Sequence, residues 1–119
     1  MRSIHPKRGE IWQVDLDPTV GSEIQKSRPC VIVSADWIGR LPVRLVVPIT
    51  GWKPAYQEYP WCVPINPDTV NGLTKVSAAD TFQTRAVSLL RMSVRLGELP
   101  EATMAAIAQA VAVCVDYEP

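Results

Sequence analysis

The sequence predicts a mainly β protein, a small barrel of antiparallel strands followed by one C-terminal helix. Short apolar runs separated by turn-forming residues fill most of the chain, and only the last segment repeats apolar residues at three- and four-residue steps. Eleven prolines are scattered among these runs, which favours many short strands. Because 119 residues suit one domain and no linker or repeat interrupts them, we expect a single domain over residues 1–119.

The predicted strands follow one another along the chain. Residues 9–16 (GEIWQVDL) combine β-branched and aromatic residues after a glycine. Residues 30–35 (CVIVSA) and 44–50 (RLVVPIT) are continuous apolar runs, typical of strands buried on two faces or lying in a barrel wall. Residues 61–65 (WCVPI) contain a proline, which confines that strand to an edge or a bulge because proline has no amide donor. Residues 73–88 predict one or two further strands.

The final segment, residues 100–115, has helical periodicity. Pro100 can occupy the first turn, and Glu101 favours the positive end of the helix dipole. The apolar positions of one helical face are Met104, Ile107, Ala108, Val111 and Cys114 or Val115. Many short strands followed by such a helix define the predicted fold class.

Composition excludes several classes of protein. Hydrophobic residues make up 47% of the chain, which argues against disorder, and no apolar stretch approaches the roughly 18 residues of a membrane span. The polar start, MRSIHPKRGE, lacks the apolar region of a secretory signal, so we expect a cytoplasmic protein. The formal net charge of zero is not typical of nucleic-acid binding, although eight Lys and Arg against six Asp and Glu in residues 1–60 permit a local basic groove.

Cysteine and histidine are too few for common metal or triad chemistry. Cys30, Cys62 and Cys114 lie far apart without paired spacing, which predicts free buried thiols. His5 is the single histidine of the sequence, so a zinc site or a Ser-His-Asp triad has almost no candidate residues. We therefore expect no metal and no cofactor.

The order of the motifs resembles the MazF/PemK toxin endoribonucleases. KRGEIWQVDLDPTVGSE is followed by KSRPCVIVS, VVPIT, NGLTKVS, QTRAVS and LGELPE, from about Lys7 to the terminal helix. The resemblance implies an SH3-like antiparallel barrel of the CcdB/MazF type and a homodimer. It also implies the toxin of a type II toxin-antitoxin system, an mRNA interferase that cleaves single-stranded RNA at short sequences without a metal. Its partner would be a MazE-like antitoxin whose C-terminal tail blocks the active site.

The resemblance also implies particular site residues. The family's arginine before proline falls on Arg28, its threonine at the end of the next long strand on Thr50, and the glutamate of the first loop on Glu23. Three further motif positions, which we interpret as RNA-binding, fall on Ser77, Gln83 and Arg85.

One position departs from the family pattern. Several members carry an acidic residue directly before the motif glutamine, and some give it a catalytic role, whereas this chain has Phe82. Asp80 is nearby, but in a regular strand over residues 80–85 alternate side chains leave on opposite faces, and Asp80 would point elsewhere. The identity of the general base is therefore left open.

The chemistry of RNA fits these residue types. Its 2′-hydroxyl is an internal nucleophile, so cleavage to a 2′,3′-cyclic phosphate and a 5′-hydroxyl requires positioning, proton transfer and charge stabilisation. Arg28 can hold two phosphate oxygens through its planar fork, with Pro29 fixing the backbone beside it. Thr50 offers a hydroxyl donor. Glu23 can act as the base towards the 2′-hydroxyl if it is desolvated beside Arg28 and Lys26, although a solvated loop glutamate is an equally ordinary reading.

Cations and aromatic rings on both sides of Thr50 predict an RNA-binding groove. The candidates are Lys26, Trp52, Lys53, Tyr56 and Tyr59, whose rings can stack on unpaired bases. Trp61 is an alternative core or dimer contact.

Two other functions remain open at this level. A CcdB-type toxin would bind gyrase through its last helix, but AAIAQAVAVCV is mostly small and apolar and suits packing. A catalytically silent SH3-like binding module is the second alternative, because Phe82 replaces the acidic residue.

Overall fold

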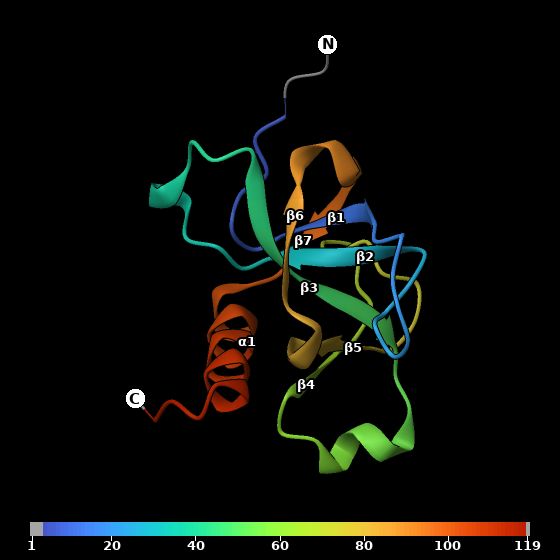
Figure 1. Ribbon diagram of the computed structural model, residues 1–119. Coiled ribbons are helices and arrows are strands. Elements are labelled where there is room, and N and C mark those ends of the chain that lie inside the picture. The colour runs from blue at the N-terminus through green and yellow to red at the C-terminus, as the bar shows by residue number, and fades with distance from the viewer. Residues whose placement is uncertain (1–3, 119) are drawn as a thin grey trace.

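The longest strand of the sheet, β3 (Val43–Gly51), pairs with three other strands. The computed structural model describes residues 4–118. Within this range the other strands are β1 (Glu10–Asp15), β2 (Ser27–Ile32), β4 (Cys62–Ile65), β5 (Ser77–Asp80), β6 (Arg85–Ser88) and β7 (Met92–Glu98). The helix α1 (Glu101–Cys114) follows β7, and the short 3-10 turns are η1 (Asp36–Ile38), η2 (Pro54–Glu58), η3 (Thr81–Gln83) and η4 (Leu89–Arg91) (Figure 1).

All pairings in the sheet are antiparallel, and their order is β4-β5-β3-β2-β1-β7, with β6 pairing the first half of β3. In the described residues this path has two ends, because no pairing joins β4 to β7. The closed barrel predicted from the sequence is therefore not confirmed. The coarser prediction, a mainly antiparallel β fold with one C-terminal helix, is confirmed, and the proline-containing strand β4 lies at the edge as expected.

The structure corrects three details of the predicted elements. β2 begins at Ser27, so Arg28 and Pro29 lie inside the strand instead of before it. Residues 73–88 form two strands, but η3 interrupts them where a continuous strand would have run through residues 80–85. β7 was not predicted at all, although it pairs with β1; four of its seven residues are exposed, so its hydrophobic alternation is weak.

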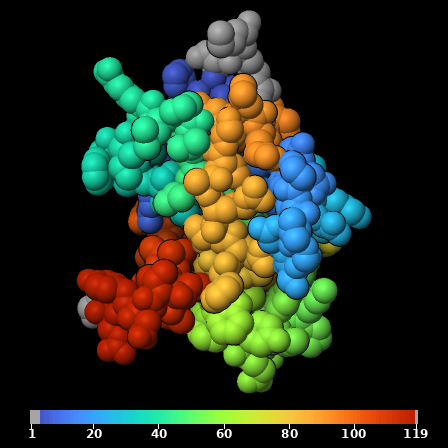
Figure 2. Space-filling model, viewed as in Figure 1, coloured from blue at the N-terminus to red at the C-terminus, as the bar shows by residue number. Residues whose placement is uncertain are grey.

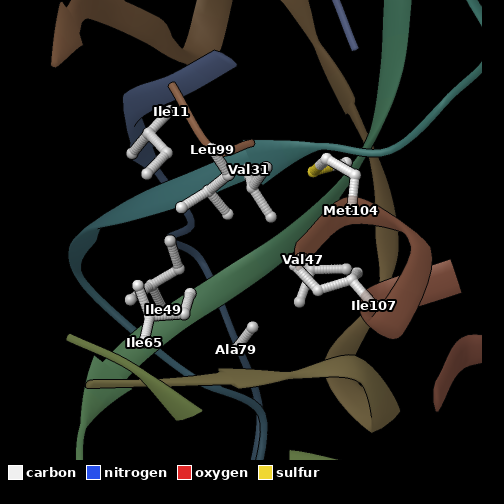
Figure 3. Close-up of a cluster of buried hydrophobic side chains, with 9 residues drawn as sticks. All are labelled: Ile11, Val31, Val47, Ile49, Ile65, Ala79, Leu99, Met104 and Ile107. Atoms are coloured by element: carbon white, nitrogen blue, oxygen red, sulfur yellow. The ribbon is translucent and has the colours of Figure 1, made fainter. Parts of the chain in front are cut away.

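Two clusters of buried side chains lie on opposite faces of the sheet. Successive residues of a strand point to opposite faces, so Val47 of β3 belongs to one cluster and Val46 to the other. The first cluster packs against α1 and comprises Ile11, Val31, Val47, Ile49, Ile65, Ala79, Leu99, Met104 and Ile107 (Figure 3). The second comprises Trp12, Val14, Leu16, Cys30, Ile32, Val46, Val87 and Met92.

The helix buries Met104, Ile107 and Ala110. The predicted helical face is thus right at Met104 and Ile107 and wrong at Ala108, which is exposed. Cys30 and Cys62 are free and buried as predicted, whereas Cys114 is only half-buried. Of the residues described, no helix combines the length and the apolar character needed to cross a membrane.

Candidate functional site

Arg28 and Thr50 are carried by neighbouring strands. The ladder of β2 and β3 pairs Cys30 with Pro48. Arg28 and Thr50 each lie two residues beyond that pair, near the start of β2 and the end of β3. Both side chains leave the sheet on the face of the second cluster, because Cys30 and Val46 belong to that cluster and each lies an even number of residues away. Arg28 and Thr50, two of the three residues assigned to catalysis from the sequence, therefore share one face of the sheet.

Arg28 is half-buried, and its side chain is oriented by its own loop. Its Nε donates to the carbonyl of Gln25 at 3.1 Å. This bond uses the inner nitrogen of the guanidinium and not its two terminal nitrogens. A guanidinium held in this way can present a fork of donors to a phosphate group.

Glu23 and Lys26 lie in the loop of residues 16–26 that joins β1 to β2. Both side chains are exposed. Glu23 Oε1 accepts a hydrogen bond from Val20 N at 2.6 Å, so the carboxylate closes a turn inside the loop.

The loop is joined to η3 and β6 by two residues that the sequence predicted to bind RNA. Gln83 accepts from Ile24 N at 3.2 Å and donates to the Ser22 carbonyl at 3.1 Å. Arg85 Nη1 donates to the Leu16 carbonyl at 3.1 Å. In Figure 2 the loop, in light blue, lies against the orange segment that contains these residues. In this conformation Gln83 and Arg85 therefore support the loop.

Ser77, the first residue of β5, and Lys75, two residues before it, lie beside the end of β3. Ser77 pairs with Gly51, but its side chain is buried and donates to the Lys75 carbonyl at 2.8 Å, so it is not exposed to a ligand. A Cβ added at Gly51 would meet Lys75 Nζ at 3.1 Å, which means that the ammonium rests over the glycine. Lys75 is thus a cation next to Thr50 that sequence reasoning missed, and its place in the NGLTKVS motif was the available signal.

The aromatic residues after Gly51 form a continuous row. Their rings follow in the order Trp52, Tyr56, Tyr59, Trp61 and Phe82, with successive centroids 4.8 to 6.1 Å apart. Trp52 N donates to the Val76 carbonyl, which ties the start of the row to β5 next to the site. Phe82 at the other end is 66% exposed and precedes Gln83, the residue that holds the loop. Trp61 and Phe82 extend the predicted aromatic set. Lys53 is exposed at the start of η2, directly after Trp52.

Asp80 ends β5 and caps η3. Its Oδ1 accepts from Phe82 N at 3.2 Å. Burial raises the pKa of this half-buried carboxyl, and the main-chain N–H groups of Phe82 and Gln83 partly oppose that effect. Ala78 of β5 is the pairing partner of Thr50, and Asp80 lies two residues after Ala78. The side chains of Ala78 and Asp80 therefore leave β5 on the same face. The expectation that Asp80 would point elsewhere depended on a regular strand, which η3 replaces.

Two buried thiols also lie near this region. Burial raises the pKa of Cys62 to about 11 and that of Cys30 to about 12, so neither is a ready nucleophile at neutral pH. Among residues 4–118 no group of three or more His, Cys, Asp or Glu side chains is arranged to hold a metal ion.

Comparisons with known proteins identify the family and the fold. A sequence model of the PemK-like, MazF-like toxins of type II toxin-antitoxin systems matches residues 7–115. Endoribonuclease MazF9 of Mycobacterium tuberculosis is 35% identical to the chain over 116 residues, which cover 92% of this chain and 96% of the relative. Among solved structures, MazF of Deinococcus radiodurans superimposes with a TM-score of 0.80 at 19% identity, over 96% of this chain and 99% of that one. A mycobacterial endoribonuclease in complex with its cognate antitoxin gives 0.74 at 22% identity, over 96% and 98%.

The fold and these matches define a small β-sheet toxin with a C-terminal helix. The chain belongs to the family of PemK-like, MazF-like toxins of type II toxin-antitoxin systems, because the family match spans most of its length. The family predicted from the order of the sequence motifs is confirmed.

The raised pKa of Asp80 leads to a pH-dependent prediction. A carboxyl whose pKa is higher in the folded state destabilises the fold while it is ionised, and this cost disappears as the pH falls through the folded pKa. Asp80→Asn keeps an acceptor for Phe82 N but carries no charge. We expect its free energy of unfolding to exceed that of the wild type at pH 7, with the difference shrinking towards pH 4. Urea unfolding at several pH values measures this, and a difference that does not vary with pH would contradict it.

Proposed function

We propose that this chain, as a single domain, is a metal-independent endoribonuclease that cleaves single-stranded RNA in the cytoplasm. The observation that carries the proposal is the position of Arg28 and Thr50 on one face of adjacent strands, each two residues beyond the Cys30–Pro48 pair. The names of relatives that are endoribonucleases support the same reaction class. A forked cation and a hydroxyl on rigid strands suit the stabilisation of negative charge that develops on a phosphate.

In the proposed mechanism the 2′-hydroxyl of the substrate attacks the adjacent phosphorus. The bond from phosphorus to the 5′-oxygen of the next nucleotide breaks, which leaves a 2′,3′-cyclic phosphate and a 5′-hydroxyl. Arg28 and Thr50 donate hydrogen bonds to the non-bridging oxygens of the phosphorane. Glu23 accepts the proton of the 2′-hydroxyl once bound RNA displaces water from the loop, and a proton from solvent reaches the departing 5′-oxygen.

The proposed RNA path continues from the phosphate site along the aromatic row. Lys26, Lys53 and Lys75 offer backbone contacts, and Trp52 and Tyr56 offer ring faces and edges to unpaired bases. The same region contains Ser77, Gln83 and Arg85, whose side chains form hydrogen bonds within the protein. We therefore assign them mainly to holding the site and only secondarily to contact with RNA.

The first test is direct cleavage. The purified chain, incubated with a long single-stranded RNA in EDTA, is expected to cut at a short recurring sequence and to leave 2′,3′-cyclic phosphate and 5′-hydroxyl ends, because the 2′-hydroxyl supplies the nucleophile. Mapping of the ends by sequencing, before and after phosphatase and kinase treatment, identifies them. A strict requirement for a divalent metal, or a 5′-phosphate product, would rule out this mechanism. Absence of any cleavage would favour the silent binding module.

Substitution of Arg28 tests the site itself. Arg28→Ala is expected to lower the rate roughly 10³-fold or more, the scale of arginine stabilisation in phosphoryl transfer. Arg28→Lys is expected to restore only part of it, because the forked geometry is lost. Thr50→Ala is expected to lose on the order of 10² to 10³, by analogy with one oxyanion donor. Arg95→Ala is the matched control, since Arg95 pairs with Glu10 and Glu98 on β1 and β7. A folded Arg28→Ala protein with near wild-type rate would refute the site.

The assembly proposed for the chain is a homodimer that is inhibited by an antitoxin. Trp37 and Leu90 are 87% and 95% exposed, and a groove of about 1140 Å³ lined by Leu41, Val43 and Leu89 lies between their segments. Exposed apolar surface of this kind favours a second copy of the chain. The surface around Arg28, Thr50 and residues 51–60, with its cations and aromatic rings, suits an acidic, partly apolar antitoxin tail.

Assembly is measurable by sedimentation equilibrium. The chain alone is expected to have the mass of a dimer at micromolar concentration. Addition of the protein encoded by the adjacent reading frame should give a heavier complex that no longer cleaves RNA, and its affinity should fall as salt rises, because charge pairing at an exposed groove is screened. A monomer would contradict the dimer, and a complex that still cleaves RNA would contradict the blocked site.

A further inference from the structure

Two arginines hold the point where the 16–26 loop leaves β1. Arg91 Nη1 donates to the carbonyls of Asp15, at 3.1 Å, and Asp17. Arg85 Nη1 donates to the carbonyl between them, that of Leu16. Three consecutive main-chain acceptors are therefore bound by two half-buried cations from a distant part of the chain. Charge-assisted bonds to three successive carbonyls restrict the backbone at this point.

The same point of the loop is bonded to the start of β2. Leu16 N donates to the Lys26 carbonyl at 2.9 Å, and Asp17 Oδ1 accepts from Lys26 N at 3.1 Å. Lys26 adopts a left-handed backbone conformation, with φ of 72°, which is costly for a residue other than glycine and persists only where its surroundings impose it. Arg28 follows two residues later in β2, and its Nε donates to the carbonyl of Gln25, the residue before Lys26. The conformation of this end of the loop therefore bears on where the guanidinium points.

Gln83 holds the middle of the loop from the other side. Its amide group bonds to both Ile24 N and the Ser22 carbonyl. With Arg85 and Arg91 it forms a clamp, defined here as these three residues, that contacts the loop at Asp15, Leu16, Asp17, Ser22 and Ile24. All three clamp residues come from one stretch, residues 83–91.

The clamp also relates the loop to Thr50. Arg85 lies on β6 opposite Val46 of β3, and Thr50 is four residues further along the same strand. Arg28 bonds to the loop, and the clamp bonds to the same loop. Through Arg85 the clamp belongs to β6, which pairs with β3, the strand that carries Thr50. The relative position of the two proposed catalytic groups depends on this chain of contacts as well as on the sheet.

We infer that Arg91, with Gln83 and Arg85, is a positioning residue that holds the 16–26 loop in the conformation in which Arg28 faces Thr50. The inference rests on the proposed ribonuclease function. It differs from a role in RNA binding, because the clamp donates its hydrogen bonds to the protein backbone. Loss of the clamp should impair catalysis through misplacement of Arg28 and leave the number of phosphate contacts unchanged.

The experiment compares Arg91→Ala, Arg91→Lys, Gln83→Ala and the control Arg95→Ala. Arg95 lies on β7 and pairs with Glu10 and Glu98, away from the loop. Arg91→Ala is expected to lower kcat about 10- to 100-fold, the scale of a small misplacement of a catalytic group, with little change in KM. Arg91→Lys should recover most of this loss, since a single Arg91 nitrogen serves both carbonyls and an ammonium can replace it. Arg28→Lys should not recover its activity in this way, because Arg28 needs the forked geometry of the guanidinium and not a single nitrogen.

Amide hydrogen exchange locates the effect without reference to RNA. Exchange at Leu16 and Lys26 should accelerate at least about tenfold in Arg91→Ala, and exchange at Ile24 in Gln83→Ala, because those N–H groups bond within the clamped loop. Arg95→Ala should leave all three unchanged. Unaltered exchange in both clamp variants would overturn the clamp. Faster exchange with an unchanged kcat would overturn the positioning role.

Salt dependence separates positioning from direct RNA contact. Binding of an RNA with a 2′-deoxy group at the cut site, measured over a range of salt, should give the same slope for Arg91→Ala and the wild type. A slope reduced by roughly 0.7 with a raised Kd would mean that Arg91 binds a phosphate, which would overturn the inference. If the wild type cleaves no RNA, the proposed function fails, while the exchange measurements still decide whether the clamp exists.

Discussion

The pairing of β3 with β2, β5 and β6 is the constraint on which the rest of the molecule depends. Its first half pairs with β6, its middle with β2 and its last residues with β5. Alternate residues of the same strand contribute to both hydrophobic clusters, so the strand cannot slip by one residue without exchanging the two faces. A fixed register at β3 therefore also fixes the position of Thr50 along the strand direction relative to β2.

Arg28 is subject to a second constraint, because its guanidinium donates through Nε to the Gln25 carbonyl of the long exposed loop that precedes β2. Surface loops usually have the freedom that catalytic groups must not have. Here the backbone of the loop is bonded at its base to Arg85 and Arg91 and in its middle to Gln83. The hydrogen bonds of these side chains to main-chain groups restrict the motion of the loop. Donors that stabilise a charged transition state must be held in place before the reaction, and a site with few residues depends on each of them.

Much of the fold was predictable from local sequence. Apolar runs gave β1, β3 and β4 within a residue or two, and the three- and four-residue periodicity gave α1. β7 was missed because its side chains are largely exposed and its stability comes from pairing with β1, a partner some eighty residues away in the chain. The closed barrel was not confirmed because closure depends on how the two end strands meet, which no local pattern encodes.

The sequence by itself determined the family, and with it the candidate residues Arg28 and Thr50, because these depend on the order and spacing of short motifs. Only the tertiary structure decided what Gln83 and Arg85 bond to, that Ser77 is buried, that Lys75 rests over Gly51, and that Asp80 caps a turn. A polar side chain in a motif has the same sequence signature whether it faces a ligand or a backbone carbonyl. Its partner is chosen by contacts between distant segments, and those exist only in the folded chain.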